Sequence, residues 1–261
     1  MPDTREWLHR LWTRRPEWKP SAPAGARVYA VGDIHGRCDL LQALLEQVWT
    51  DAAQTECANT LVFLGDYIDR GPQSREVIDL LLGLPRPGWE FVMLRGNHEQ
   101  MALAFCEDAA VYRTWRDYGG AQTLASYGVR PPAFDSAEEF TKAREVFVGM
   151  LPLSHRDFLM ALPYSHAVGD YLFVHAGIRP GIPLDAQAPD DMMWIRDDFL
   201  SSGRMWGKVV VHGHSPSERP VVRKNRIGID TGAYATGCLT ALVLEGEGRR
   251  FLSTKRDQGQ R

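Results

Sequence analysis

The chain has 261 residues, of which 44% are hydrophobic and 24% charged, and its formal net charge at pH 7 is −3. The length fits one large domain or two small ones, and the composition is that of an ordinary globular protein. The slightly acidic balance argues against a protein that mainly coats nucleic acid or an acidic membrane, because such proteins carry a basic excess. We therefore expect no nucleic-acid partner. No apolar run approaches the ~18 residues needed to span a bilayer.

The N-terminal segment 1–26 is expected to be an extension and linker, followed by a single domain over 27–261. We expect its apolar residues to form a stripe on a short basic helix that packs on the protein's own surface, with contact to a membrane or a partner as the alternative. These residues are Trp7, Leu8, Leu11 and Trp12. The prolines and small residues of the following PEWKPSAPAG stretch cannot continue a helix. The segment has neither the apolar core nor the cleavage site of a secretory signal.

The cysteines indicate neither a zinc ribbon nor a disulfide framework, because they are scattered and have no CxxC spacing. They are Cys38, Cys57, Cys106 and Cys238. We expect reduced, partly buried thiols and a cytoplasmic location.

One pattern recurs along the rest of the chain: a short apolar run, typical of a buried strand, ends in glycine plus Asp, Asn or His. The motifs that follow the five runs are GDIHG at 32–36, GDYIDRG at 65–71, RGNHE at 95–99, HAG at 175–177 and HGH at 212–214. Helical patterns starting at Cys38 and Ser74 separate the first strands. This alternation predicts an α/β fold with parallel strands, whose carboxyl ends gather the polar motifs at one site.

Two regions depart from this pattern. Residues 100–165 are rich in helical sequence and carry no polar strand-end motif, so we expect a helical excursion over the site. The tail 226–246 has the pattern of two further strands joined by a glycine-containing turn.

The strand-end motifs together supply oxygen and imidazole donors without a thiolate, a set that suits Mn²⁺, Fe or Zn²⁺. The candidate ligands are Asp33, His35, Asp66, Asn97, His175 and His214. Six ligands are too many for one four-coordinate ion, but they fit two ions about 3.5–4 Å apart that share a carboxylate. Asp66 belongs to the motif between the other ligand groups and is the expected bridge. His212 shares a motif with His214, and the residues alone leave open whether both bind metal.

Two such cations lower the pKa of a shared water towards neutrality and so supply hydroxide as a nucleophile. His98 lies beside Asn97 and is a candidate general acid, with Asp69 as the partner that fixes its tautomer. Arg70 offers the planar two-point contact that phosphate favours, and Arg95 and Arg196 are further candidates for it. No Cys or Ser occupies a motif position, which favours one-step hydrolysis over a covalent intermediate.

The five motifs, in this order over residues 28–215, resemble the signature of the phosphoprotein phosphatase family of dinuclear metallophosphoesterases. The resemblance implies a β-sandwich flanked by helices, with two metals at the strand ends. By position it implies one metal on Asp33, His35 and Asp66, and the other on Asp66, Asn97, His175 and His214. It also implies His98 as general acid, Asp69 as its partner, and Arg70, Arg196 and Arg95 as phosphate ligands.

Substrate class divides related enzymes. Symmetrical diadenosine tetraphosphatases share the GP-x-S-x-EV continuation found at 71–77, but they typically lack the Asp-Arg pair after the bridging Asp and carry GNHD. This chain has Asp69, Arg70 and Glu99, and its WRDYGGAQTLASYG stretch resembles bacterial protein phosphatases. We therefore expect a Mn²⁺-dependent serine/threonine phosphoprotein phosphatase, with a phosphorylated protein or small phosphoester as partner. The alternatives are a symmetrical diadenosine tetraphosphatase, a metal-binding sensor and, more weakly, a metallonuclease.

Overall fold

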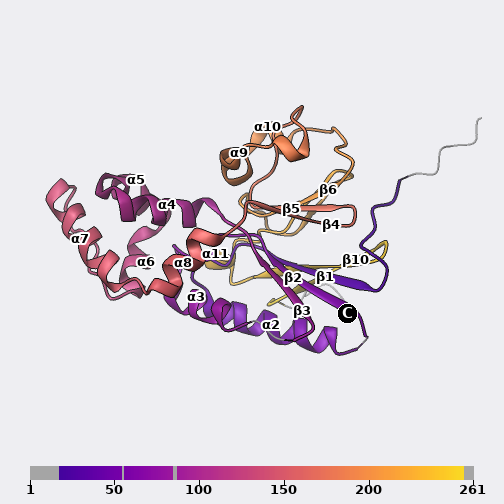
Figure 1. Ribbon diagram of the computed structural model, residues 1–261, viewed down its shortest axis with the longest axis horizontal. Coiled ribbons are helices and arrows are strands. Elements are labelled where there is room, and N and C mark those ends of the chain that lie inside the picture. Colours follow the sequence, from indigo (N-terminus) through magenta and orange to yellow (C-terminus); the bar gives the residue numbers. More distant parts are fainter. Residues whose placement is uncertain (1–17, 55, 85–86, 256–261) are drawn as a thin grey trace, which may run out of the picture.

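The computed structural model describes residues 18–54, 56–84 and 87–255. The apolar stripe expected at Trp7–Trp12 lies outside them. Ten strands in the described part of the chain form two five-stranded sheets that pack face to face, with helices outside (Figure 1). This arrangement confirms the predicted α/β fold and its helix-flanked β-sandwich.

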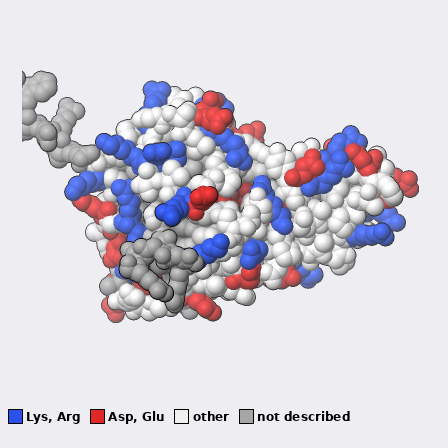
Figure 2. Space-filling model, turned by 180° about the vertical axis from the view of Figure 1, so that it is seen from behind, with Lys and Arg blue, Asp and Glu red and all other residues white. Residues whose placement is uncertain are grey.

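On the face shown in Figure 2, the basic and acidic side chains of the surface are interspersed.

The first sheet has the order β10-β9-β1-β2-β3. Strands β1, β2 and β3 are parallel, and β9 and β10 run antiparallel to their neighbours. The bounds are β1 Ala26–Val31, β2 Ala58–Phe63, β3 Trp89–Met93, β9 Thr240–Glu245 and β10 Gly248–Ser253. The three parallel strands contain the first three apolar runs of the sequence, and each requires a crossover to reach the next.

The second sheet has the order β4-β5-β6-β8-β7, with β5, β6 and β8 parallel and the two outer strands antiparallel. The bounds are β4 Ser165–Val168, β5 Tyr171–Val174, β6 Val209–His212, β7 Val221–Val222 and β8 Arg226–Gly228. Val28 and Val62 of the first sheet share a buried cluster with Phe173 and Val211 of the second. This cluster is the core between the sheets and holds their strand ends in a fixed relation.

Helices cover both outer faces of the sandwich. Helix α2, Cys38–Ala52, and helix α3, Ser74–Leu82, confirm the two helical patterns read from the sequence. Leu41 and Leu44 of α2 pack with Tyr29 and Phe63 on the outer face of the first sheet. Over the second sheet lie η3 Leu184–Ala186, α9 Pro189–Trp194 and α10 Asp197–Leu200, whose Phe199 packs against that sheet.

The segment 97–161, between β3 and β4, is helical and lies at one end of the sandwich (Figure 1). Its elements are α4 Asn97–Glu107, η1 Ala109–Val111, α5 Tyr112–Trp115, η2 Arg116–Tyr118, α6 Gly120–Ser126, α7 Ala137–Met150 and α8 Leu153–Ala161. Its interior is aromatic: Phe105, Trp115 and Phe147 are fully buried against one another. We call this part of the chain the helical segment.

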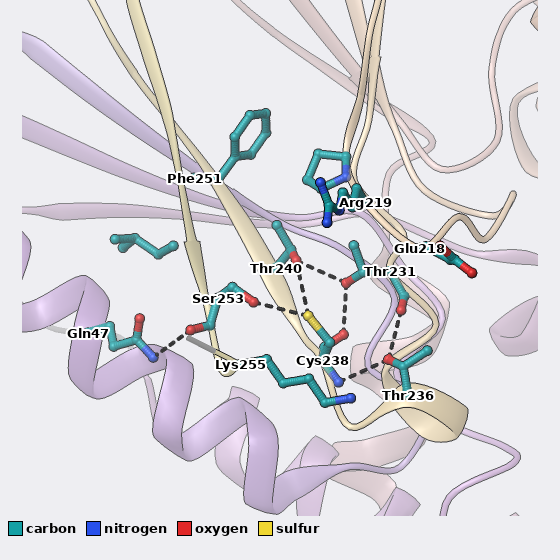
Figure 3. Close-up of a pocket in the computed structure, with 12 residues that line it drawn as sticks. Gln47, Glu218, Arg219, Thr231, Thr236, Cys238, Thr240, Phe251, Ser253 and Lys255 are labelled. Atoms are coloured by element: carbon teal, nitrogen blue, oxygen red, sulfur yellow. Dashed lines mark hydrogen bonds between the residues drawn. The ribbon is translucent and has the colours of Figure 1, made fainter. Parts of the chain in front are cut away.

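The tail contains the two strands predicted from the sequence, and the connection between them contains glycines, but it also includes a short helix. Strand β8 belongs to the second sheet and β9 to the first, and the short helix α11, Ala233–Thr236, lies between them. Gly232 and Gly237 flank α11 in left-handed conformations, which suits glycine. The side chain of Thr236 donates to the Thr231 carbonyl and accepts from the Cys238 N–H, which closes the helical turn (Figure 3).

None of the helices in the described part of the chain combines the length and the apolar character that a membrane crossing needs.

Candidate active site

The candidate ligands follow the strands as the sequence predicted. Asp33 follows β1, Asp66 follows β2, and Asn97 begins α4 after β3; His175 follows β5, and His214 follows β6. All of them, and His35, are at least nine-tenths buried. The backbone N–H of His214 donates to Asp33 Oδ2 over 2.9 Å, which joins the ends of the two sheets.

The backbone is strained at this place. In the described residues, the non-glycine residues with positive φ are His35, Asp66, Asp69, Arg70 and His214. Every one of them is a site residue predicted from the sequence. Such conformations cost on the order of 1–3 kcal/mol each and are typical of functional sites.

The side chains converge on the Asp66 carboxylate. Its Oδ2 lies 3.6 Å from His35 Nε2, 3.7 Å from His98 Nε2 and 3.3 Å from His175 Nε2. Two groups of possible ligand atoms, each within 4.8 Å, share Asp66: one adds His35 and His98, and the other adds His175 and His214. A shared carboxylate is the arrangement that two neighbouring cations need.

Two atoms at the site are buried without a hydrogen-bond partner: Asp33 Oδ1 and His214 Nε2. Buried polar atoms are nearly always paired, because an unpaired one costs about 1–3 kcal/mol. A carboxylate oxygen and an imidazole nitrogen are both ligands of divalent cations. The residues therefore fit a metal centre.

Backbone carbonyls orient two of the imidazoles. His35 Nδ1 lies 3.0 Å from the Ile68 carbonyl, and His175 Nδ1 lies 2.9 Å from the Leu64 carbonyl. Carbonyls only accept, so each Nδ1 carries the proton and each Nε2 is left towards Asp66. This is the usual support of a metal-binding histidine.

The protein's own charges set the protonation of the ligands. Burial and nearby His98 lower the pKa of His35 to about 3, and burial and nearby His175 lower that of His214 to about 2. Burial alone would lower the pKa of His175, but Asp66 outweighs it and raises the pKa to about 10. His35 and His214 are thus neutral and ready to bind metal at pH 7, whereas His175 must lose a proton first.

Glu99 orders the loop that carries Asp66. Its carboxylate accepts from the N–H groups of Gly96, Asp66 and Tyr67 over 2.7–2.9 Å. Burial and nearby Asp66 raise the pKa of Glu99 to about 7. His212 Nδ1 meets its neighbour's carbonyl at 3.0 Å, and its ring packs on Phe199, so His212 belongs to neither ligand group.

A cavity of about 220 Å³ opens onto these groups. It is lined by His35, Asp66, Arg70, Asn97, His98, Tyr118, Arg196, His214, Pro216 and Asp230. Tyr118, Pro216 and Asp230 were not anticipated from the sequence. A signal for Asp230 existed, because it follows an apolar strand and precedes Thr and Gly, but the pattern was assigned to a turn. A larger cavity of about 600 Å³ lies by α11 and β10, and none of the predicted site residues line it (Figure 3).

Comparison with known protein families agrees with a metal-binding phosphoesterase site. The family model of calcineurin-like phosphoesterases matches residues 26–238. The chain belongs to the calcineurin-like phosphoesterase family. Members of this family are metal-dependent phosphoesterases, so the chain is a metallophosphoesterase hydrolase.

The relatives of this calcineurin-like phosphoesterase differ in their named substrates. It is 30% identical to the asymmetrical bis(5'-nucleosyl)-tetraphosphatase PrpE of Anoxybacillus flavithermus, over 81% of this chain and 88% of that protein. It is also 30% identical to serine/threonine-protein phosphatase 1 of Salmonella typhimurium, over 82% of this chain and 89% of that protein. The crystal structure of a cold-active protein-tyrosine phosphatase from a psychrophilic Shewanella shares the fold, with a TM-score of 0.56 and 19% identity over 88% of this chain and 83% of that chain.

The predicted phosphate-binding arginines fall into two kinds. Arg70 and Arg196 line the cavity, and the Arg70 guanidinium lies 4.6 Å from the centre of the Tyr234 ring. Arg95 does not reach it. Its guanidinium donates to the carbonyls of Leu159 and Met160 at the end of α8 over 3.0 and 2.7 Å.

Removing divalent cations is expected to lower the unfolding temperature of this phosphoesterase. Burial, Asp230 and Asp66 raise the pKa of the Asp33 carboxyl well above its usual range, and burial and Asp66 raise the pKa of Asp230. A cation that binds only the folded state adds about 2.7 kcal/mol at a hundredfold excess over its Kd. Thermal unfolding with EDTA, and then with added Mn²⁺ or Zn²⁺, measures the effect. Equal unfolding temperatures in all conditions would contradict a metal centre.

Proposed function

We propose that this chain is a metal-dependent phosphomonoester hydrolase, and specifically a serine/threonine phosphoprotein phosphatase. The observation that supports it most is the pairing of His98 and Asp69 beside the two ligand groups: His98 Nδ1 lies 2.6 Å from Asp69 Oδ2. A metal-binding sensor has no need of a proton donor held in this way. Hydrolysis needs one, because the leaving oxygen must gain a proton.

The proposed ligands are Asp33, His35 and Asp66 for one cation, and Asp66, Asn97, His175 and His214 for the other. Mn²⁺ is the proposed ion, since all the donors are oxygen or imidazole nitrogen. Two divalent cations, when bound, make hydroxide available near neutral pH and neutralise phosphate oxygens. Asp66 holds the two ligand groups together, and the carbonyls behind His35 and His175 keep Nε2 of each ring directed at them.

His98 is proposed to protonate the leaving oxygen. Its Nδ1–H donates to Asp69, which leaves Nε2 as the atom that faces the cavity. The distances also admit His98 as a ligand of the first cation. Its bond to Asp69 favours the role of acid, because the carboxylate stabilises the protonated ring.

Arg70 and Arg196 are proposed to hold the phosphate through paired N–H donors. Replacing Arg70 or Arg196 by alanine is expected to lower kcat/KM for a phosphomonoester by about 10- to 100-fold, since a hydrogen bond to a charged group contributes about 1.5–3 kcal/mol. Steady-state kinetics measure this. Arg95→Ala is the matched control, and it should lower the unfolding temperature while kcat/KM stays the same. A loss of kcat/KM in Arg95→Ala equal to that in Arg70→Ala would contradict the assignment.

The choice of a phosphoprotein substrate is supported by the Asp69–Arg70 pair and Glu99, and by the Salmonella relative named as a serine/threonine-protein phosphatase. The test is a comparison of kcat/KM for a phosphoserine peptide and for diadenosine tetraphosphate at one Mn²⁺ concentration. The proposal expects the peptide to be preferred. A clear preference for the dinucleotide would overturn it and leave the fold and metal site unaffected.

Hydrolysis of a dinucleoside polyphosphate is the second candidate. It is supported by the Anoxybacillus relative named as a tetraphosphatase and by aromatic side chains near the cavity. Trp194 and Tyr234 are each partly exposed, and their rings lie 6.3 Å from His214 and 5.4 Å from His35. Exposed aromatic rings of this kind can stack on a nucleobase.

We also propose a cytoplasmic location and a single catalytic domain over 27–261, with the helical excursion at about 100–165. Free thiols support the location, because Cys38, Cys57, Cys106 and Cys238 form no disulfide in the described residues.

A further inference from the structure

The Asp69 side chain has more partners than a simple support for His98 requires. It is fully buried, and its carboxylate accepts three hydrogen bonds. Oδ2 accepts from His98 Nδ1 over 2.6 Å and from Trp115 Nε1 over 2.7 Å. Oδ1 accepts from Thr123 Oγ1 over 2.5 Å. Both oxygens are therefore held, and the carboxylate cannot rotate without breaking at least one bond.

The hydroxyl proton of Thr123 has one available acceptor, the Asp69 carboxylate. The Thr123 hydroxyl accepts from the Asp69 N–H over 2.9 Å and contacts Ser74 Oγ at 3.0 Å. A hydroxyl has a single proton, and a carboxylate can only accept, so Thr123 donates that proton to Asp69. Ser74 must then donate to Thr123. The chain Ser74 to Thr123 to Asp69 has one direction, which fixes the plane of the carboxylate opposite His98.

Both donors come from the helical segment, to which the sequence assigned no chemistry. Trp115 is the last residue of α5, and Thr123 lies in α6. They are 46 and 54 residues away from Asp69 along the chain. The Trp115 ring packs against Phe105 and Phe147, and these contacts restrict its movement.

Two glycines bring the helical segment this close. A Cβ on Gly119 would lie 2.4 Å from the Arg70 nitrogen, and one on Gly120 would lie 2.4 Å from the Trp115 ring. Gly119 also adopts a left-handed backbone conformation with φ of 97°. Its carbonyl accepts a hydrogen bond from the Arg70 N–H over 3.3 Å. The WRDYGG stretch thus places the indole of Trp115 and the loop with Asp69 and Arg70 in direct contact.

We propose that Trp115 and Thr123 are positioning residues for leaving-group protonation. They hold the Asp69 carboxylate in the orientation that keeps the Nδ1–H of protonated His98 bound to it. The second proton of the imidazolium, on Nε2, then faces the leaving oxygen and is the one transferred. This rests on the proposed function, in which His98 is the general acid. A residue that only fills the core would affect stability and would slow all substrates equally. A positioning residue slows most the substrate whose leaving group needs the proton.

The kinetic test uses Trp115→Phe and Thr123→Val, which remove a donor and keep most of the buried volume. A general acid contributes ~10²–10⁴-fold, and loss of one donor to its partner is expected to remove about tenfold of it from kcat for a phosphoserine peptide. With p-nitrophenyl phosphate, whose leaving group departs without a proton, kcat should be nearly unchanged. Thr123→Ser should restore the wild-type ratio of the two rates. Phe147→Leu opens a cavity against the same indole but removes no donor, and it should leave the ratio unchanged.

A second readout does not depend on turnover. The ¹⁵N resonances of the His98 ring are measured in the full chain with diamagnetic Zn²⁺ in the buffer, at a pH where the ring has lost its transferable proton and is neutral. They report which nitrogen keeps the remaining proton. They are expected to show a fixed Nδ1–H tautomer in the wild type and in Phe147→Leu, and a mixture in the Trp115→Phe, Thr123→Val double variant. An unchanged tautomer, or equal slowing of both substrates, overturns the positioning role. Wild-type protein that hydrolyses neither monoester overturns the proposed function instead. The tautomer measurement then still shows whether the hydrogen bonds of Trp115 and Thr123 to Asp69 fix the His98 ring.

Discussion

Replacing Asp66 by asparagine is expected to reduce the bound metal from two ions per chain to less than one and to remove detectable phosphatase turnover. Asp66 is the residue that the two ligand groups share. Its Oδ2 lies within 3.7 Å of Nε2 in His35, His98 and His175. Asparagine has the same shape but no negative charge, so neither group keeps a bridging ligand. Elemental analysis of dialysed protein, with turnover measured on the same sample, gives both numbers.

Asp230→Asn is the matched control for this change. Asp230 is a buried carboxylate that lines the same cavity, but it belongs to neither ligand group. Loss of its charge should leave two ions bound and should lower the pKa of Asp33, since Asp230 is a principal cause, after burial, of the raised value. If Asp66→Asn kept two ions and normal turnover, the bridging role would be wrong.

The positions of individual strands were predictable, because each of these strands has a recognisable sequence pattern of its own. An apolar run followed by glycine and a polar residue reports burial and the place where a strand ends, and β1, β2, β3, β5 and β6 were found in this way. Burial does not report a strand's partner. Strands β8 and β9 are neighbours in sequence, but they lie in different sheets, and the connection predicted as a glycine-containing turn includes helix α11 between its glycines.

The site was predictable where its residues sit on the strand ends, and less so elsewhere. Trp115 in a helical apolar stretch predicts a core residue, and only the contact across 46 residues shows that its N–H meets Asp69. Arg95 had the sequence context of a phosphate ligand, but the carbonyls of α8, 64 and 65 residues further on, bind its guanidinium. Long side chains take their direction from tertiary partners, which no local pattern contains.

Replacing His98 by asparagine is expected to lower kcat for a phosphoserine peptide by ~10²–10⁴-fold, the usual contribution of a general acid. Burial alone would lower the pKa of His98, but the Asp66 and Asp69 carboxylates outweigh it and raise the pKa. The protonated ring therefore persists to higher pH than in an ordinary histidine. Wild-type kcat should fall on the alkaline side as His98 loses its proton, and a pH–rate profile of His98→Asn should lack that limb.

Metal content separates this prediction from the first. His98→Asn should keep two ions per chain, because none of the proposed ligands is lost, whereas Asp66→Asn should not. The loss of rate should also be much smaller with p-nitrophenyl phosphate, whose leaving group needs no acid. If His98→Asn lost one ion and slowed both substrates alike, His98 would be a ligand of the first cation. Asp69 would then orient a metal-binding imidazole, a role that its bond to Nδ1 also permits.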